Sequence, residues 1–324
     1  MKKSLSGKQF SFGTFGFWKS YLIHMRPYLF FVSGLAGLSG IALSDISGFP
    51  VWKTIILFIP FFLGYGFGQA LTDCFQIDTD KISSPYRPMS QGIVSVKSVL
   101  LTSIVGLTFI GSMLFLFHIY SFLFSLLAVF GLATYSYVKK NIWFGGPFYN
   151  AWIMALLPVM GYFASAGNVV KIFPENHYHL ILITFFCYAN FVLIGYLKDI
   201  DADRETGYKT FPVVFGWTKT MMVGDVFGII ALTIFWNSGV DTMASYIFGI
   251  VGSIIFIIGQ TLGHISKHKN EKEAMIPIIS TVRTFILIHS ALVLQQKPEW
   301  VIQMLILYIL FEIVLYYRPS KYQI

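Results

Sequence analysis

The chain has 324 residues, of which 56% are hydrophobic and only 12% are charged, and its mean hydropathy is +0.69. A soluble domain carries roughly a quarter charged residues, so this composition excludes an ordinary soluble domain and predicts a protein that crosses a membrane several times. Two cysteines, Cys74 and Cys187, are too few for a disulfide framework.

The first 26 residues are basic and aromatic, which favours an arm at the membrane interface. Apolar runs long enough to cross roughly 30 Å of hydrocarbon follow. They lie at 28–46, 52–71, 98–117, 119–138, 149–167, 179–197, 220–238, 243–262, 276–295 and 300–317. The run at 276–295 contains Arg283 and His289 and could instead be a re-entrant or peripheral helix. We therefore predict an all-α polytopic membrane protein with nine or ten transmembrane helices.

Its domain plan is simple: an arm at 1–26, one transmembrane domain at 27–318 and a tail at 319–324. If the N-terminus is cytoplasmic and all ten runs span, nineteen basic residues fall on the inner side and one, Arg283, lies in the doubtful run. The outer loops hold three basic residues, namely Lys53, Lys171 and Lys297. Basic residues concentrate in cytoplasmic loops. The basic cytoplasmic loops therefore account for the net charge of +8, and we expect no nucleic acid as a partner. The expected location is an inner membrane of the bacterial type.

Two cytoplasmic stretches, 72–92 and 198–212, hold seven of the fifteen acidic residues, each after an apolar run. In the second, KDIDADRETGYKTFP, Asp199 and Asp203 are four residues apart. They would share one helix face if the preceding helix continues, and Asp201 would point elsewhere. Carboxylates on one face can share a divalent cation such as Mg²⁺.

The first stretch, TDCFQIDTDKISSPYRPMSQG, has a comparable pattern. Asp73 and Asp80 are seven residues apart and would also share a helix face, whereas Asp78 would join them only if the helix frays. A lone acidic cluster at a helix end is usually just solvated, but two such clusters facing one cavity favour metal binding. The predicted metal ligands are Asp73, Asp78, Asp80, Asp199 and Asp203.

Basic and hydroxyl side chains accompany the acids. Arg87, Lys139, Lys198 and Lys209 are candidates to hold phosphate, and Tyr135 lies one helical turn before Lys139. Each base alone would be an ordinary membrane-surface anchor. Carboxylates, Mg²⁺ and bases together form the set that holds a diphosphate and stabilises its charge as it leaves.

The stretch KDIDADRETGYKTFPVVFG resembles the second aspartate motif of the UbiA superfamily of intramembrane prenyltransferases, in which D-x-x-x-D is followed by G-x-x-T. The first stretch resembles that family's N-D-x-x-D-x-x-x-D…RP…G motif. The matching positions are Thr72, Asp73, Gln76, Asp80, Arg87, Pro88 and Gly92. Tyr135 and Lys139 look like its Y-x-x-x-K element, and the resemblance covers roughly residues 24–262.

This resemblance implies helices around a central, lipid-open cavity and Mg²⁺-dependent transfer of a prenyl group from a prenyl diphosphate to a hydrophobic acceptor, aromatic or lipid, in the membrane. It implies isoprenoid biosynthesis, two Mg²⁺ ions and the following roles. The catalytic residues would be Asp73, Asp80, Lys139, Asp199 and Asp203, and the substrate-binding residues would be Thr72, Gln76, Arg87, Tyr135, Lys198 and Lys209. Thr72 replaces the family's usual Asn and Gln76 its usual middle Asp, so the first metal site has lost a charge.

Two alternatives remain open. A membrane terpene cyclase would ionise the same diphosphate and trap the cation with the substrate's own double bond. A transporter or lipid-binding protein belongs to a different class, and its acids would be expected nearer the middle of spans. Only Asp225 and Glu312 lie inside the apolar runs.

Overall fold

The computed structural model describes residues 9–44, 51–167 and 172–321, and these are helical with no β-strand among them. The α-helices are α1 (Phe15–Met25), α2 (Phe30–Ala42), α3 (Val51–Asp73), α4 (Ile77–Ser83), α5 (Val96–Phe117), α6 (Ile119–Asn141), α7 (Gly145–Ala166), α8 (Tyr178–Gly195), α9 (Ile200–Glu205), α10 (Phe211–Trp236), α11 (Met243–Ile265), α12 (Glu271–Gln296) and α13 (Val301–Tyr316). Four short 3-10 turns connect them: η1 (Pro27–Leu29), η2 (Glu175–His177), η3 (Tyr196–Asp199) and η4 (Pro298–Trp300).

Eight of the described helical segments are long and apolar enough to cross a membrane. They are Trp52–Asp73, Val96–Phe117, Ile119–Asn141, Glu175–Glu205, Phe211–Trp236, Met243–Ile265, Glu271–Gln296 and Pro298–Tyr316. The prediction of an all-α polytopic membrane protein is confirmed. The count of nine or ten spans stays a prediction, because α2 is a shorter apolar helix and α7 is not among the eight.

The doubtful run at 276–295 lies in α12, which is one continuous helix of 26 residues. Most of α12 is buried, and it packs against α2, α8 and α11. This continuous, buried helix favours a span over a re-entrant or peripheral helix, and the span itself stays a prediction. The polar side chains of α12 are accommodated by partners: Arg283 forms an ion pair with Glu312 of α13, and His289 hydrogen-bonds with Thr184 in the core.

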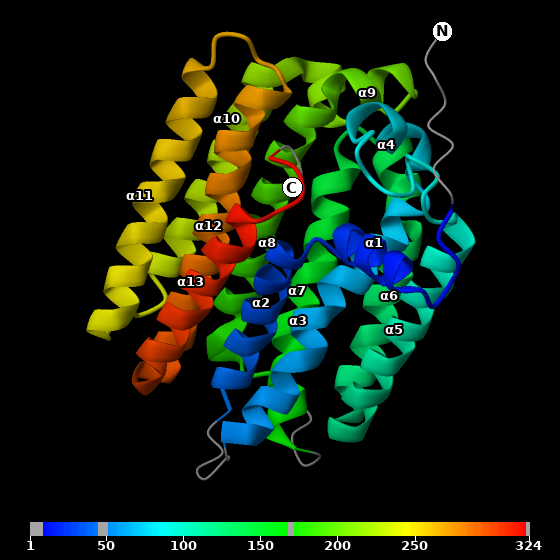
Figure 1. Ribbon diagram of the computed structural model, residues 1–324. Helices are drawn as coiled ribbons and strands as arrows, with labels where there is room; N and C mark the ends of the chain where they lie inside the picture. The colour runs from blue at the N-terminus through cyan, green and yellow to red at the C-terminus, as the bar shows by residue number, and fades with distance from the viewer. Residues whose placement is uncertain (1–8, 45–50, 168–171, 322–324) are drawn as a thin grey trace, which may run out of the picture.

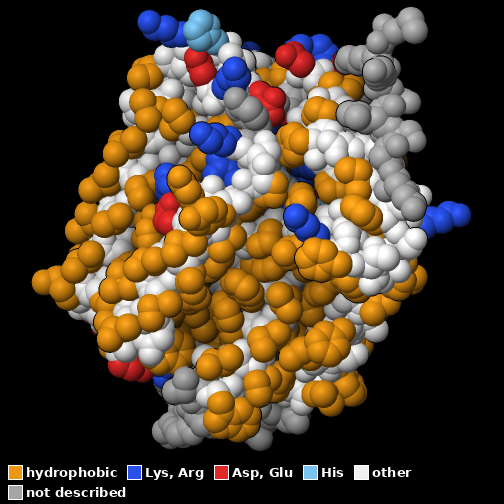
Figure 2. Space-filling model, in the orientation of Figure 1, with side chains coloured by type: hydrophobic (Ala, Val, Ile, Leu, Met, Phe, Trp, Pro, Cys, Tyr) orange, Lys and Arg blue, Asp and Glu red, His pale blue; other side chains and the backbone are white. Residues whose placement is uncertain are grey.

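The helices stand side by side, and the short helices α4 and α9 lie together at one end (Figure 1). Charged side chains gather at that same end, while hydrophobic side chains cover the middle of the visible face (Figure 2). This distribution is typical of a protein whose middle faces lipid. Both acidic stretches thus lie at the polar end of the bundle.

Small residues allow α2 and α7 to approach closely. A Cβ added to Gly40 would lie 1.8 Å from the carbonyl oxygen of Pro158, and one added to Gly161 would lie 2.1 Å from that of Gly37. Only glycine permits such backbone contact, which is the usual way helices pack inside membranes. The contact fixes α7, one wall of the cavity described below.

Candidate active site

A large cavity is lined by α3, α5, α6, α7 and α8, with α4 and η3 at its polar end. The predicted site residues on its surface are Thr72, Asp73, Gln76, Asp80, Arg87, Tyr135, Lys139, Lys198 and Asp199. The rest of the wall is largely apolar and includes Leu107, Ile110, Leu132, Ile153, Met154, Leu157, Phe191 and Val192. The cavity therefore joins a charged end to an apolar chamber.

Asp73, the last residue of α3, is buried at the centre of a polar cluster. The Nη2 of Arg26 donates to Oδ1 at 2.9 Å and to Oδ2 at 3.1 Å, and the amide of Gln69 donates to Oδ1 at 2.8 Å. The Nδ1 of His24 lies 3.4 Å from Oδ2, and the Nη1 of Arg87 lies 3.6 Å from Oδ1. Four side chains therefore share one carboxylate.

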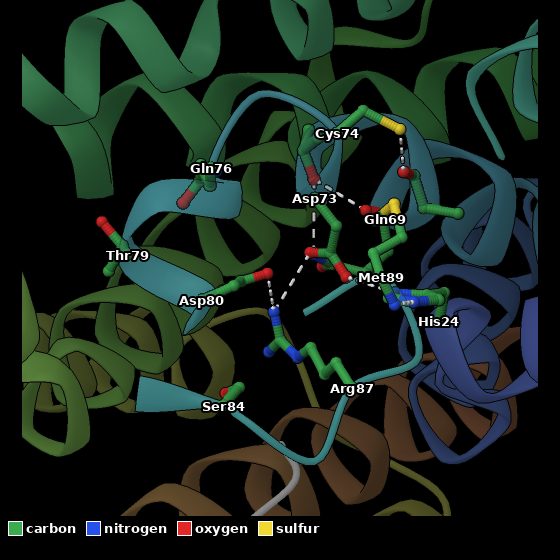
Figure 3. A network of polar contacts seen from close by, with 12 residues as sticks. His24, Gln69, Asp73, Cys74, Gln76, Thr79, Asp80, Ser84, Arg87 and Met89 are labelled. Atoms are coloured by element: carbon green, nitrogen blue, oxygen red, sulfur yellow. Dashed lines mark hydrogen bonds and ion pairs between the residues drawn. The ribbon is translucent and has the colours of Figure 1, made fainter. Parts of the chain in front are cut away.

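Arg87 joins this cluster to α4, because its Nη1 also forms a close ion pair with Asp80. Figure 3 shows the Arg87 side chain pointing between Asp80 and Asp73, with Gln76 and Thr79 apart from them. Burial raises the pKa of the Asp80 carboxyl, and the Arg87 guanidinium opposes that shift. The guanidinium thus pairs with two of the three acids of the first stretch, Asp73 and Asp80.

The prediction that Asp73 and Asp80 share a face of one helix is wrong in detail. Helix α3 ends at Asp73, Gln76 has non-helical backbone angles (φ −122°, ψ 21°), and α4 begins at Ile77. The two acids come together because the loop after α4 returns Arg87 between them.

Lys139 of α6 connects the two acidic stretches. Its Nζ donates to the Oε1 of Gln76 at 3.2 Å and lies 3.4 Å from the Oδ1 of Asp203. The amide nitrogen of Gln76 in turn donates to the hydroxyl of Ser136 at 3.1 Å. The neutral side chain at position 76 therefore binds a base, as a carboxylate would.

The second stretch is not a simple continuation of the preceding helix. Helix α8 ends at Gly195, the turn η3 follows, and Asp199 (φ −107°, ψ 8°) precedes α9. Asp199 lines the cavity, whereas the Asp203 side chain is fully buried. The side chain of Asp201 is 96% exposed and pairs only with Arg204 among the described residues, so the prediction that it points elsewhere is confirmed.

The residues present fit a metal ion on this second side. The Oδ1 of Asp203 is buried without a hydrogen bond and has a long ion pair, at 3.4 Å, with the Nζ of Lys139, and the Asp199 side chain lines the cavity. Mg²⁺ binds one or two carboxylates and takes its other ligands from water or substrate phosphate. Within residues 9–44, 51–167 and 172–321, no three His, Cys, Asp or Glu side chains form a metal cluster on their own. Substrate oxygens would therefore have to complete the coordination.

Two predicted residues lie outside the cavity. Asp78 is exposed, accepts from Lys140 at 3.1 Å and accepts from the Tyr208 hydroxyl at 3.2 Å. Lys209 is also exposed, and its backbone N–H donates to the carbonyl of Lys140. The structure thus does not bring these two side chains to the candidate site. Because α4 is a separate helix, its exposed face carries Asp78 away from Asp80.

The same contacts join α4 to α9. The hydroxyls of Thr79 and Thr206 lie 2.9 Å apart, and the backbone N–H of Tyr208 donates to the carbonyl of Asp203 at 2.8 Å. Burial raises the pKa of Tyr208 to about 12, so its hydroxyl remains a donor at neutral pH. The two acidic stretches therefore form one connected cover over the polar end of the cavity.

Several residues of this site were not predicted from the sequence. Arg26 and His24 come from the N-terminal arm, and Gln69 precedes Asp73 by one turn of α3. The hydroxyl of Tyr196 lies 2.6 Å from that of Tyr135, and its ring lies under Lys139. The signal available for Gln69 was its i, i+4 spacing to Asp73, whereas Arg26 lies 47 positions away and leaves no local pattern.

Comparison with known sequences identifies a consistent set of similar proteins. The UbiA prenyltransferase family matches residues 31–288. The digeranylgeranylglyceryl phosphate synthase of Pyrococcus horikoshii is 26% identical over 215 residues, which cover 66% of this chain and 75% of the relative. The enzyme of the same name from Thermococcus kodakarensis is 30% identical over 216 residues, with the same coverage.

Solved structures share the fold. A UbiA homologue from Aeropyrum pernix K1 superposes with a TM-score of 0.64 at 18% identity, covering 81% of this chain and 96% of that one. A UbiA homologue from Archaeoglobus fulgidus, solved with GPP and Mg²⁺ bound, superposes with a TM-score of 0.60 at 16% identity, covering 83% and 99%.

Proposed function

The chain belongs to the UbiA prenyltransferase family, and we propose that it transfers the prenyl group of a prenyl diphosphate to a hydrophobic acceptor within the membrane, with Mg²⁺ as cofactor. The observation that carries this proposal is the cavity itself. Its charged end offers carboxylates and bases to a diphosphate, and its apolar chamber suits an isoprenoid chain.

Asp199 and Asp203 would hold Mg²⁺, which offsets the diphosphate charge as the carbon–oxygen bond breaks. Arg87 and Lys139 line the same end and would stabilise the departing diphosphate. The cover formed by α4 and α9, defined above, would limit the access of water. Apolar and aromatic walls would then keep the allylic cation from premature capture, because they present no nucleophile.

A lipid acceptor with a glyceryl phosphate group is the first candidate. The relatives are named for a product that carries geranylgeranyl groups on glyceryl phosphate, which supports this class over an aromatic acceptor. The charged end of the cavity is compatible with such a group. The proposal includes an orientation in a bacterial-type inner membrane. The end with α4 and α9 faces the cytoplasm, in agreement with the distribution of basic residues.

The transporter alternative loses its support in the structure. The two acids inside spanning helices, Asp225 and Glu312, each pair with a base of a neighbouring helix, namely His264 and Arg283. Neither acid lines the cavity.

Incubation of the purified chain in lipid nanodiscs tests the proposal. Prenyl diphosphates of several lengths are supplied with Mg²⁺ and either a glyceryl phosphate lipid or an aromatic acceptor, and released diphosphate and product mass are measured. A product equal to acceptor plus prenyl group is expected. A cyclised hydrocarbon formed without an acceptor would identify a terpene cyclase instead, and no diphosphate release with any substrate would overturn the proposal.

A further inference from the structure

The two halves of the charged end differ in what they lack. On the side of the first acidic stretch, the Nε atoms of Arg26 and Arg87 are buried donors without a partner. On the side of the second stretch, the Oδ1 of Asp203 is buried without a hydrogen bond, its ion pair with the Nζ of Lys139 is long at 3.4 Å, and Asp199 lines the cavity beside it. Buried polar groups are costly unless they find partners. Buried donors without a partner favour an anion, whereas a carboxylate that lines the cavity beside a second, loosely paired carboxylate favours a cation.

Asp73 has little capacity left for a metal. A carboxylate offers about four acceptor positions, and donors from Arg26, Gln69 and His24 already occupy this one, with Arg87 nearby. To bind an ion at short range, Asp73 would have to release these donors, and the buried guanidinium of Arg26 would lose its partner. Breaking such a buried pair is strongly unfavourable.

The histidine contact has a defined direction. The backbone N–H of Met89 donates to the Nε2 of His24 at 3.1 Å, so this nitrogen carries no proton. The other ring nitrogen, Nδ1, lies 3.4 Å from the Oδ2 of Asp73 and is therefore the nitrogen that can donate to it. His24 thus presents a donor to Asp73, and it also ties α1 to the loop after α4.

The backbone of Arg26 supports the same conclusion. Arg26 has left-handed angles (φ 53°, ψ 69°), which are unfavourable for any residue other than glycine. In this conformation its guanidinium reaches both oxygens of Asp73 while the residue lines the cavity. The pair is therefore a feature that the fold maintains at a local conformational cost.

The remaining candidates for a first metal site are also engaged. Asp80 forms its close pair with Arg87. Gln76 carries no charge, and its oxygen already accepts from Lys139 while its nitrogen donates to Ser136. Around Asp73 and Asp80 the cavity thus has two guanidinium groups, Arg26 from the N-terminal arm and Arg87 from the first stretch, and both carboxylates are already paired.

We propose that this chain uses a single divalent cation, bound at Asp199 and Asp203, and that Arg26 and Arg87 hold the diphosphate where the first acidic stretch would otherwise bind a second ion. This inference rests on the proposed function and departs from the two ions that the sequence predicts. Each guanidinium has N–H groups beyond those used on Asp73 and Asp80, and a planar guanidinium is well suited to phosphate.

The number of bound ions tests the inference directly. Mn²⁺ is titrated into the purified chain in nanodiscs at saturating inorganic pyrophosphate, and bound Mn²⁺ is counted by equilibrium dialysis and electron paramagnetic resonance. One Mn²⁺ per chain is expected, and two would overturn the inference. This count needs no catalysis, so failure of prenyl transfer and failure of the one-ion inference are distinguishable.

Variants identify which half holds the ion. Asp199→Asn should abolish Mn²⁺ binding, Asp80→Asn should retain one ion, and Asp201→Asn serves as an exposed control that also retains one. The reverse pattern, with loss in Asp80→Asn and retention in Asp199→Asn, would overturn the assignment. Size-exclusion profiles and thermal unfolding establish that each variant is folded, and the wild-type count remains decisive if one is not.

Pyrophosphate affinity supplies the second measurement. Arg87→Gln should weaken pyrophosphate binding by about ten- to a hundredfold, the usual loss for a hydrogen bond to a charged group, while one Mn²⁺ still binds at saturation. Unchanged pyrophosphate affinity would contradict the role given to the guanidinium.

Discussion

The ammonium of Lys139 lies 3.4 Å from the carboxylate of Asp203, although the two residues come from α6 and α9 and are far apart in the sequence. The same ammonium forms an ion pair with no other acid in the described part of the chain, and it also donates to the Oε1 of Gln76. One base thus lies between the two acidic stretches, where a diphosphate would contact both.

Replacement of this base should impair the reaction itself. We expect Lys139→Met to lower kcat for diphosphate release about a hundredfold or more, because one positioned charge at a developing anion typically contributes that much. Lys140→Met is the matched control, since Lys140 is adjacent but pairs with exposed Asp78. Equal losses in the two variants would indicate a general effect of surface charge.

The three aspartates of the second acidic stretch lie in contrasting surroundings. Asp199→Ala and Asp203→Ala should each abolish diphosphate release, because Asp199 lines the cavity and Asp203 is buried beside Lys139. Asp201→Ala should keep near wild-type activity, because its side chain is 96% exposed. A steady-state assay with one prenyl diphosphate compares them, and comparable loss from all three would refute the distinction.

The apolar runs, the acidic helix ends and the basic loops were readable from the sequence because each is a local pattern. The pairing of Asp73 with Arg26 was not, because it depends on how α1 packs against α3. The prediction that Asp73 and Asp80 share a helix face failed for a related reason. It assumed one continuous helix from Asp73 to Asp80, whereas the helix is interrupted at Gln76. Periodicity predicts faces within an element, whereas the site depends on where elements end.

Helix packing behind the cavity can be tested separately from chemistry. Gly161→Ala should lower the Tm by several degrees, because the new Cβ would lie 2.1 Å from the backbone oxygen of Gly37 and overpacking costs about 1–3 kcal/mol. Gly195→Ala is the control, since nothing lies within 4 Å of its added Cβ. A fluorescence-monitored thermal unfolding experiment in detergent should separate the two, and identical Tm values would show that α2 and α7 can move apart freely.

Membrane orientation needs reporters that are exposed in the structure. Cysteines introduced as Lys81→Cys in α4 and Glu205→Cys in α9 should resist impermeant thiol reagents in intact cells and react after lysis. Ile172→Cys, 73% exposed at the opposite end, should react from outside. The native Cys74 and Cys187 are buried and give little background. Labelling of position 81 or 205 in intact cells would reverse the orientation.

A substitution of Gln76 tests whether this residue replaces a metal ligand or positions the base Lys139. Its oxygen accepts from Lys139 and its nitrogen donates to Ser136, so Gln76→Glu would keep the length of the side chain and add a charge beside Lys139. We expect this carboxylate to attract Lys139 away from the substrate, which should raise the KM for prenyl diphosphate about tenfold, a typical loss for one charged contact.

The Mg²⁺ dependence of Gln76→Glu shows whether position 76 coordinates a metal ion or positions Lys139. If position 76 positions Lys139 and coordinates no ion, the Mg²⁺ concentration for half-maximal turnover should stay at the wild-type value. Ser136→Ala removes only the second partner of the Gln76 amide and should change both constants little. A marked fall in the Mg²⁺ requirement of Gln76→Glu would mean that the added carboxylate restores a second metal site, and the first stretch would then be a weakened metal site and not a guanidinium site for diphosphate.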